Sequence, residues 1–249
     1  MRSIYVLIVL VLISCQKPAP PKTDTRLIAK QAMIVTARAE ASEIGLSILK
    51  QGGNAFDAMV ATEIALAVAF PFAGNICGGG FMVYRTDQGQ TGALDYREKA
   101  PLASNRDMYL DENKEIIPGK STRGALAVGV PGTVAGIFAV HKKFGSLPID
   151  SLIQPAIKLA RQGVVVTENQ ENSLENSRDL IKKISGENIL FSKPYKAGDT
   201  IKHLAFAETL TKIKDNGRDE FYKGQTAEDI VEFLESNGGI ITLEDLEKY

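Results

Sequence analysis

The sequence predicts an α+β fold that is rich in helices. Apolar residues recur at helical spacing through most of the chain, and two short apolar runs joined by a polar turn predict a pair of strands. The composition, 44% hydrophobic and 24% charged, is that of an ordinary globular domain. A formal net charge of -1, with the charges dispersed, argues against nucleic acid as a partner.

The first fifteen residues have the pattern of a lipoprotein signal peptide. Arg2 gives a positive start, and the apolar run over 4–13 is too short to span a bilayer. The run ends at a small residue followed by Cys15, as in a bacterial lipobox. Residues 16–29 contain three prolines and predict an extended tether. We expect an exported protein, lipid-anchored through Cys15 on the periplasmic or cell-surface side; the alternatives are a plain secretory signal and an uncleaved anchor.

The domain proper is expected over residues 30–249, and its first elements are a strand and two helices. The apolar run Ala32–Ala37 predicts a buried strand. Helical spacing then predicts a helix that stops at Gly52 and Gly53. Residues 55–70 are apolar on nearly all sides and rich in alanine, which predicts a helix buried in the core.

A glycine loop over residues 74–80 precedes the predicted pair of strands, 81–85 and 91–96. A phosphate cradle requires the order strand, glycine loop, helix, and here a helix comes first, so we interpret the loop as a close backbone approach. Cys77 in this loop is predicted to be a small buried residue, because no base lies nearby in the sequence to activate it.

The second half of the chain predicts further helices. They begin near Pro131 and end at Gly145, run over 152–160, start at Thr167, run over 206–213 and 227–234, and begin again at a capping pattern over 242–245. Both histidines, His141 and His203, fall in these segments without a second ligand at metal spacing, so we expect surface or half-buried side chains and no metal or cofactor. The last helix has barely begun at residue 249, which suggests that the domain continues further.

One segment carries chemistry, the stretch from Asp95 to Pro101. Arg97 lies at the end of an apolar strand, where its planar guanidinium can bind a carboxylate with two hydrogen bonds. The alternative is that Arg97 pairs internally with Asp95, Glu98 or another acid. The stretch 119–122 matches only the tail of a phosphate-binding loop and lacks its first glycine, so we exclude a nucleotide site.

Several segments, in this order, resemble the γ-glutamyltranspeptidase family. They are residues 41–49, 52–58, 78–82, 95–101, 129–136, 144–145, 219–224 and 238–246. The resemblance extends from about residue 30 to the last residue, and so many ordered blocks are highly specific.

The resemblance implies the αββα sandwich of an N-terminal-nucleophile hydrolase, of which this chain is the helix-rich large-subunit portion. Such a precursor cleaves itself before a threonine, whose hydroxyl then attacks glutathione or another γ-glutamyl compound and whose amine serves as base. Water or an amino acid accepts the γ-glutamyl group, and backbone amides hold the oxyanion. The resemblance implies that Arg97 binds the α-carboxylate of the glutamyl group and that Asp95 and Glu98 position its loop.

Two departures from the family pattern stand out. Many members have a His-Pro pair where this chain has Arg38 and Ala39, which we interpret as a surface variation. The family's catalytic threonine lies further downstream than the segments matched here. No threonine of this chain has the nucleophile's context; those considered were Thr122, Thr133, Thr167, Thr209 and Thr242. We therefore expect no catalytic residue in this chain, an incomplete fold, and a missing small-subunit region as its partner.

Three functions remain open at this point. The first is a glutathione hydrolase or γ-glutamyltransferase, represented here by a fragment that is inactive and unstable alone. The second is a related acylase that acts on β-lactam side chains, which the small-subunit pocket would distinguish. The third is an inactive surface-anchored remnant or a binding module.

Overall fold

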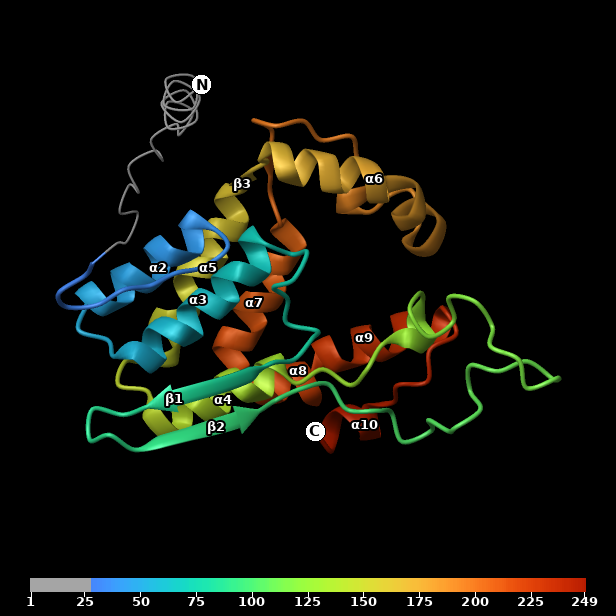
Figure 1. Cartoon of the computed structure of the whole chain (residues 1–249), viewed down its shortest axis with the longest axis horizontal. Helices are drawn as coiled ribbons and strands as arrows, with labels where there is room; N and C mark the ends of the chain where they lie inside the picture. Colours follow the sequence, from blue (N-terminus) through green and yellow to red (C-terminus); the bar gives the residue numbers. More distant parts are fainter. Residues whose placement is uncertain (1–27) are drawn as a thin grey trace, which may run out of the picture. The chain divides into compact units, whose positions relative to one another are not determined.

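The computed structural model of the chain describes residues 28–249 (Figure 1). The predicted signal peptide with Cys15, and all but the last two residues of the predicted tether, lie outside the described residues. Residues Ile34–Tyr249 form one compact unit. None of the helices in the described part combines the length and the apolar character that crossing a bilayer requires.

Helices α2 (Ala39–Lys50) and α3 (Ala55–Ala69) form where the sequence predicts them. Ten residues of α3 are buried, and they lie around the whole helix, as expected for a central element. Asn54 caps α3 by accepting hydrogen bonds from the first amides of the helix. The two helices pack closely because α2 has Gly45 at the contact, where a Cβ would lie 2.2 Å from the Thr62 hydroxyl oxygen.

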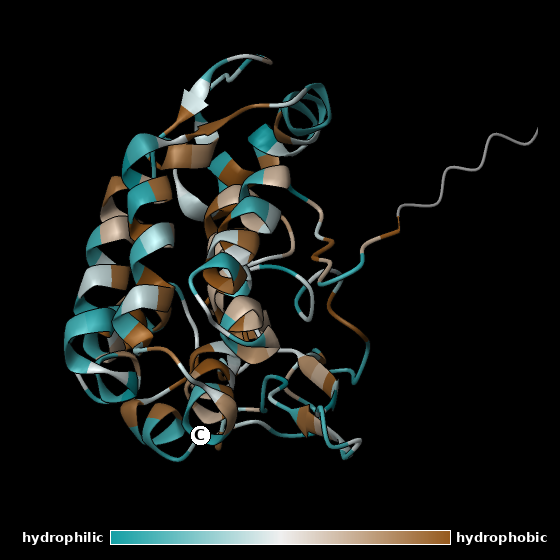
Figure 2. Ribbon diagram, turned by 90° about the vertical axis from the view of Figure 1, so that its left-hand side faces the viewer, coloured by the Kyte–Doolittle hydropathy of each residue, from teal (hydrophilic) through white to brown (hydrophobic). Residues whose placement is uncertain are grey.

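The remaining helices surround α3 or extend the molecule toward its C-terminus. They are α4 (Thr133–Phe144), α5 (Ile149–Gln162), α6 (Glu168–Ser185), α7 (Leu204–Asn216), α8 (Arg218–Tyr222), α9 (Gln225–Ser236) and α10 (Leu243–Glu247). Helix α3 packs against α2, α4 and α5, and α7 packs on α5. Figure 2 shows hydrophobic and hydrophilic residues on different sides of the same helices, the pattern that buries one side of each.

Two small antiparallel sheets accompany the helices. Strands β1 (Phe81–Arg85) and β2 (Thr91–Asp95) pair with Met82 opposite Leu94, and they confirm the predicted pair of strands. Strands β3 (Val164–Val165) and β4 (Thr200–Ile201) form a second sheet that the sequence pattern did not predict, since two residues per strand carry no periodicity. Two 3-10 turns, Ala125–Ala127 and Leu190–Ser192, complete the elements.

The prediction of a strand over Ala32–Ala37 is wrong. These residues belong to no strand, and Val35 is 81% exposed. An apolar extended segment becomes a strand only where another strand offers hydrogen-bond partners, and none of the described residues pairs with this segment.

The interpretation of Arg38 as a surface variation is also wrong. Its side chain is only 9% exposed. It donates two hydrogen bonds to the Glu40 carboxylate, from Nε at 3.0 Å and from Nη2 at 2.5 Å. Its remaining hydrogen bonds reach the Gln170 side chain in α6 and the Val165 carbonyl in β3. Arg38 therefore connects the start of α2 to the second sheet and to α6.

Two further side chains differ from expectation. His203 is buried, with 7% of its surface exposed, and burial lowers the pKa of its imidazole. Cys77 as a whole is exposed, contrary to the prediction that it is buried. Its thiol is desolvated, however, and this desolvation raises the thiol pKa to about 11. A thiol with that pKa stays protonated near neutral pH, which makes it a poor nucleophile.

Candidate functional site

The candidate site lies where β2 ends, and it brings together three blocks that the sequence singled out. Tyr96 exchanges two backbone hydrogen bonds with Gly80, at 2.9 and 3.2 Å. Lys99 exchanges two with Val130, at 3.1 and 2.8 Å. The Gly78 carbonyl accepts the amides of the two residues 132 and 133 where α4 begins. The glycine loop, the segment after β2 and the start of α4 thus form one continuous cradle.

Glycine is required in this cradle for a steric reason. A Cβ at Gly79 would lie 2.5 Å from the Tyr96 carbonyl oxygen and 2.7 Å from the Glu98 amide nitrogen. Real Cβ atoms do not approach backbone atoms so closely. The glycine loop can therefore lie directly against the residues around Arg97, which confirms its interpretation as a close backbone approach.

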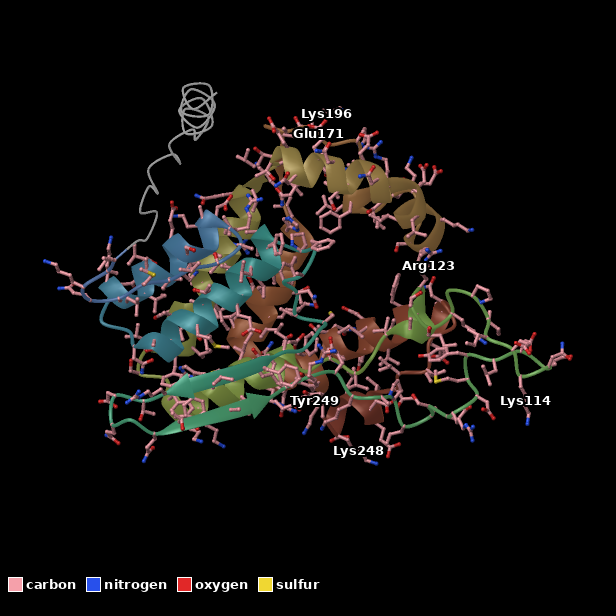
Figure 3. All side chains as sticks on the ribbon, in the orientation of Figure 1. Lys114, Arg123, Glu171, Lys196, Lys248 and Tyr249 are labelled. Carbon is pink, nitrogen blue, oxygen red and sulfur yellow. The ribbon has the colours of Figure 1, made fainter. Side chains whose placement is uncertain are left out.

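The C-terminal segment also reaches the site. The Tyr249 hydroxyl donates a 2.7 Å hydrogen bond to the Arg97 carbonyl, and its ring stacks on Tyr222. Figure 3 shows Tyr249 close to the end of β2. The Asp245 carboxylate accepts the Leu102 amide at 2.6 Å. Burial raises the pKa of the Tyr249 hydroxyl, so this group remains a donor at neutral pH.

Arg97 presents its guanidinium to solvent, with 57% of the side chain exposed. Its Nε forms an ion pair with the Glu98 carboxylate at 3.1 Å, and the guanidinium carbon lies 5.8 Å from the centre of the Phe81 ring. Its backbone amide donates to Asp95 at 2.9 Å. Within residues 28–249, its two terminal nitrogens have no hydrogen-bond or ion-pair partner.

The two sequence interpretations of Arg97, internal pairing and binding of a carboxylate, do not exclude each other. The internal pairing with Glu98 exists, but it uses only Nε. The two terminal nitrogens form a planar fork whose shape matches a carboxylate. The Asp95 carboxylate accepts the Arg97 amide and Glu98 pairs with Nε; their role in positioning the loop stays a prediction. Among the described residues, no group of three or more His, Cys, Asp or Glu side chains is arranged to hold a metal ion.

Sequence reasoning missed the residue behind this site, Glu63. Its carboxylate lies in the apolar helix α3 and accepts the Tyr96 hydroxyl, with both oxygens 3.2 Å away. Burial raises the pKa of Glu63 to about 7 and, together with the nearby carboxylate, raises that of Tyr96. The signal was present in the sequence, since a carboxylate inside an otherwise apolar helix requires a polar partner.

The threonines considered as nucleophiles have structural roles. Thr167 and Thr242 cap α6 and α10. The Thr122 and Thr209 hydroxyls donate to backbone carbonyls within three or four residues, and Thr133 is buried. None of them lies beside the Arg97 fork in the contacts of the described residues.

A separate apolar cavity of about 590 Å³ lies elsewhere in the fold. Its walls come from the end of α3, from α6 and from the second sheet, and they include Phe72, Leu174, Phe191 and His203. No residue of the Arg97 cradle lines it, so the cavity and the candidate site are different places.

Comparisons with known proteins show similarity over the part of the chain that contains the cradle. The family model for gamma-glutamyltranspeptidase matches residues 41–249. The glutathione hydrolase proenzyme of Escherichia coli is 44% identical over 225 residues, which cover 89% of this chain and 39% of that relative. This chain therefore spans about two fifths of the length of that curated relative.

Two solved structures resemble the described fold closely. The gamma-glutamyltranspeptidase of Helicobacter pylori matches with a TM-score of 0.87 and 44% identity, over 90% of this chain and 65% of that one. The gamma-glutamyltranspeptidase of Pseudomonas nitroreducens matches with a TM-score of 0.85 and 40% identity, over 89% of this chain and 66% of that one.

Proposed function

Because the chain belongs to the γ-glutamyltranspeptidase family, we propose that it provides the glutamyl-binding part of an enzyme that transfers the γ-glutamyl group of glutathione, or of related γ-glutamyl compounds, to water or to amino acids. The fold supports this assignment at the level of architecture. The predicted α+β class is confirmed as the helix-rich large-subunit portion of an N-terminal-nucleophile hydrolase.

The observation that carries the proposal is the open fork of Arg97. The α-carboxylate of a γ-glutamyl group is a planar anion, and two parallel N–H···O bonds from Nη1 and Nη2 match its oxygens. The Glu98 carboxylate lies 3.1 Å from Nε and leaves the two terminal nitrogens open. The Phe81 ring lies beside the guanidinium, 5.8 Å from its central carbon to the ring centre, and offers it a cation–π contact.

We propose that the chemical step uses a threonine outside the described residues. In the proposed mechanism its hydroxyl attacks the γ-carbonyl carbon while its own α-amine takes the hydroxyl proton. The amide C–N bond breaks, the leaving amine receives that proton, and an ester to the threonine remains. Water or the amine of an acceptor then attacks the ester and releases the threonine. Arg97 contributes by fixing the carboxylate end of the substrate during both steps.

Replacement of Arg97 by lysine tests the proposal. The R97K variant keeps the positive charge and loses the planar fork, so we expect its dissociation constant for glutathione to rise about 10- to 100-fold. The measurement is isothermal titration with glutathione on the purified protein. Arg85→Lys is the matched control, because Arg85 is an exposed arginine on the same pair of strands. Equal affinities in wild type and R97K would contradict the assignment.

The same titration separates the alternatives. A glutaryl amide keeps the carboxylate and lacks the α-amine, so preferred binding of that compound would favour the acylase function. We expect this chain alone to bind glutathione and to leave a γ-glutamyl anilide uncleaved. The reason is that none of the threonines considered among its described residues lies beside the Arg97 fork. If the purified 249-residue chain cleaves the anilide, the nucleophile lies within this chain and this part of the proposal is wrong.

We also propose that the protein is exported and anchored through a lipid on Cys15. The support is the sequence pattern around that residue and the proline-rich segment that follows it. In cells given a clickable fatty-acid analogue, wild-type protein is expected to be labelled and Cys15→Ser to be unlabelled. Cys77→Ser serves as control and should be labelled like wild type. Labelling of Cys15→Ser would contradict the anchor.

A further inference from the structure

Tyr96 links three parts of the structure through one side chain. The base of its ring lies against α4, where a Cβ at Gly136 would be 2.4 Å from the ring. The hydroxyl end lies against Gly80, where a Cβ would be 2.9 Å from the ring. Beyond Gly80, the hydroxyl reaches the Glu63 carboxylate in α3. Because glycine stands at both contacts and only 5% of Tyr96 is exposed, the ring has little room to move.

The backbone of Tyr96 is held as firmly as its ring. Its amide and its carbonyl both pair with Gly80, so the residue extends the ladder of β2 by one step. Arg97 follows immediately, and its own backbone is fixed by Asp95 at the amide and by Tyr249 at the carbonyl. The Tyr96 ring and the Arg97 side chain therefore extend from adjacent residues of one hydrogen-bonded segment.

We propose that Glu63 is a positioning residue for Arg97: by holding the Tyr96 hydroxyl, it fixes the segment from which Arg97 reaches the carboxylate of a γ-glutamyl ligand. The inference rests on the proposed function for the identity of the ligand, but not for the link between Glu63 and Arg97. Glu63 touches no ligand in this arrangement and acts only through Tyr96.

The surroundings of Glu63 make its charge state matter. Burial is the larger cause that raises the pKa of Glu63, and Tyr96 is the titratable group that donates a hydrogen bond to its carboxylate. An ionised carboxylate accepts a stronger hydrogen bond than a neutral one. Because the pKa of Glu63 is raised to about 7, the hold on Tyr96 is expected to strengthen as the pH rises from 6 to 8.

The test combines a ligand-independent readout with a binding readout. The first is the NMR signal of the Arg97 Nε–H group followed from pH 6 to pH 8, and the second is the glutathione dissociation constant over the same range. In wild type, both should change with a midpoint near pH 7. In Glu63→Gln, which keeps an acceptor and cannot ionise, both should lose this midpoint, with an affinity about threefold weaker at pH 8.

Removing the hydrogen bond altogether should have a larger effect. Tyr96→Phe keeps the ring and deletes the hydroxyl, so we expect about tenfold weaker binding and a broadened Arg97 Nε–H signal. Tyr84→Phe is the matched control, because it removes a hydroxyl from the same pair of strands that contacts Lys143 rather than Glu63. The control should keep both the midpoint and the affinity of wild type.

The outcomes separate the two proposals. An Arg97 signal that is the same in wild type, Glu63→Gln and Tyr96→Phe overturns the positioning role, whatever the affinity. An Arg97 signal that responds to these variants, in a protein that binds no glutathione, supports the positioning role and overturns the proposed function. A response in both readouts supports both.

Discussion

Asp57 is a fully buried carboxylate whose hydrogen bonds connect two parts of the core. At the first turn of α3 it accepts the Asn54 amide at 3.0 Å, which completes a capping box. It also accepts the Ser146 amide at 3.0 Å and the Ser146 hydroxyl at 2.5 Å, in the turn that follows α4. Burial by itself would raise the pKa of Asp57, but these hydrogen bonds together lower it below its ordinary value of 3.8.

Replacement of Asp57 by asparagine is predicted to destabilise the fold by about 2–4 kcal/mol at pH 7, because an amide cannot accept all of these hydrogen bonds. A group with a lowered pKa in the folded state stabilises above its unfolded pKa and loses that contribution as the pH falls. The difference between wild type and variant should therefore shrink below pH 3.8. Urea unfolding at pH 7 and pH 3 measures it.

Asp87→Asn provides the comparison for this experiment, since Asp87 is an exposed aspartate in the turn between β1 and β2. It should unfold like wild type at both pH values. If Asp57→Asn is destabilised equally at pH 7 and pH 3, the ionised carboxylate is not the source of the stabilisation.

Individual residues differ in how far the sequence predicts their roles. Arg97 could be selected because a charged fork directly after an apolar strand is unusual in itself. The burial of Arg38 could not be predicted, because two of its partners, Val165 and Gln170, lie 127 and 132 residues away. Glu63 was visible as a charge in an apolar helix, but its partner Tyr96 follows only from the fold.

Strands β1 and β2 form an element with two unlike faces. Met82 is buried toward the helices, where Tyr84 from the same face contacts the rings of Phe56 and Phe144. On the opposite face, Phe81 and Val83 are 65% and 85% exposed. Apolar residues on both faces of a strand are typical of sheets that are covered on both sides.

Replacement of Val83 by lysine is predicted to leave the fold intact and to reduce self-association of the purified chain. The side chain is already in solvent, so the free energy of unfolding should change by no more than about 0.5 kcal/mol. Removing an apolar residue from an exposed strand face lowers its tendency to aggregate. Light scattering and binding of a hydrophobic dye measure the effect.

Met82→Lys is the contrasting variant, because the neighbouring residue faces the core. It should unfold or aggregate, since a lysine charge would be buried without a partner. Equal aggregation of wild type and Val83→Lys would show that the exposed face of β1 does not drive association.

Elements were predicted well where a periodic pattern is long. All helices of twelve or more residues were predicted, and the glycine stops predicted for two of them, at Gly52 and Gly145, lie close to the observed ends. The short helix α8 and the β3–β4 sheet were not predicted, because too few residues carry a period. The strand expected over Ala32–Ala37 failed for another reason, since pairing depends on a partner that the local sequence does not specify.

At the scale of the whole molecule, the candidate site is assembled from segments far apart in the sequence. The glycine loop, the end of β2, the start of α4 and Tyr249 all contribute to the cradle of Arg97. The sequence could identify the first three of these through their resemblance to a family, but only the fold shows that they and Tyr249 are neighbours. The family membership covers residues 41–249, so the cradle belongs to the shared architecture.

The two hydrogen bonds that the Gly78 carbonyl accepts where α4 begins link ligand affinity to folding. Since α4 begins on this carbonyl and α4 also packs on the central helix α3, the cradle exists only in molecules whose core is assembled. Recognition and global folding are then thermodynamically linked. A ligand that occupies the Arg97 fork raises the melting temperature of the entire unit, and a distant core substitution lowers apparent affinity by reducing the population of competent molecules.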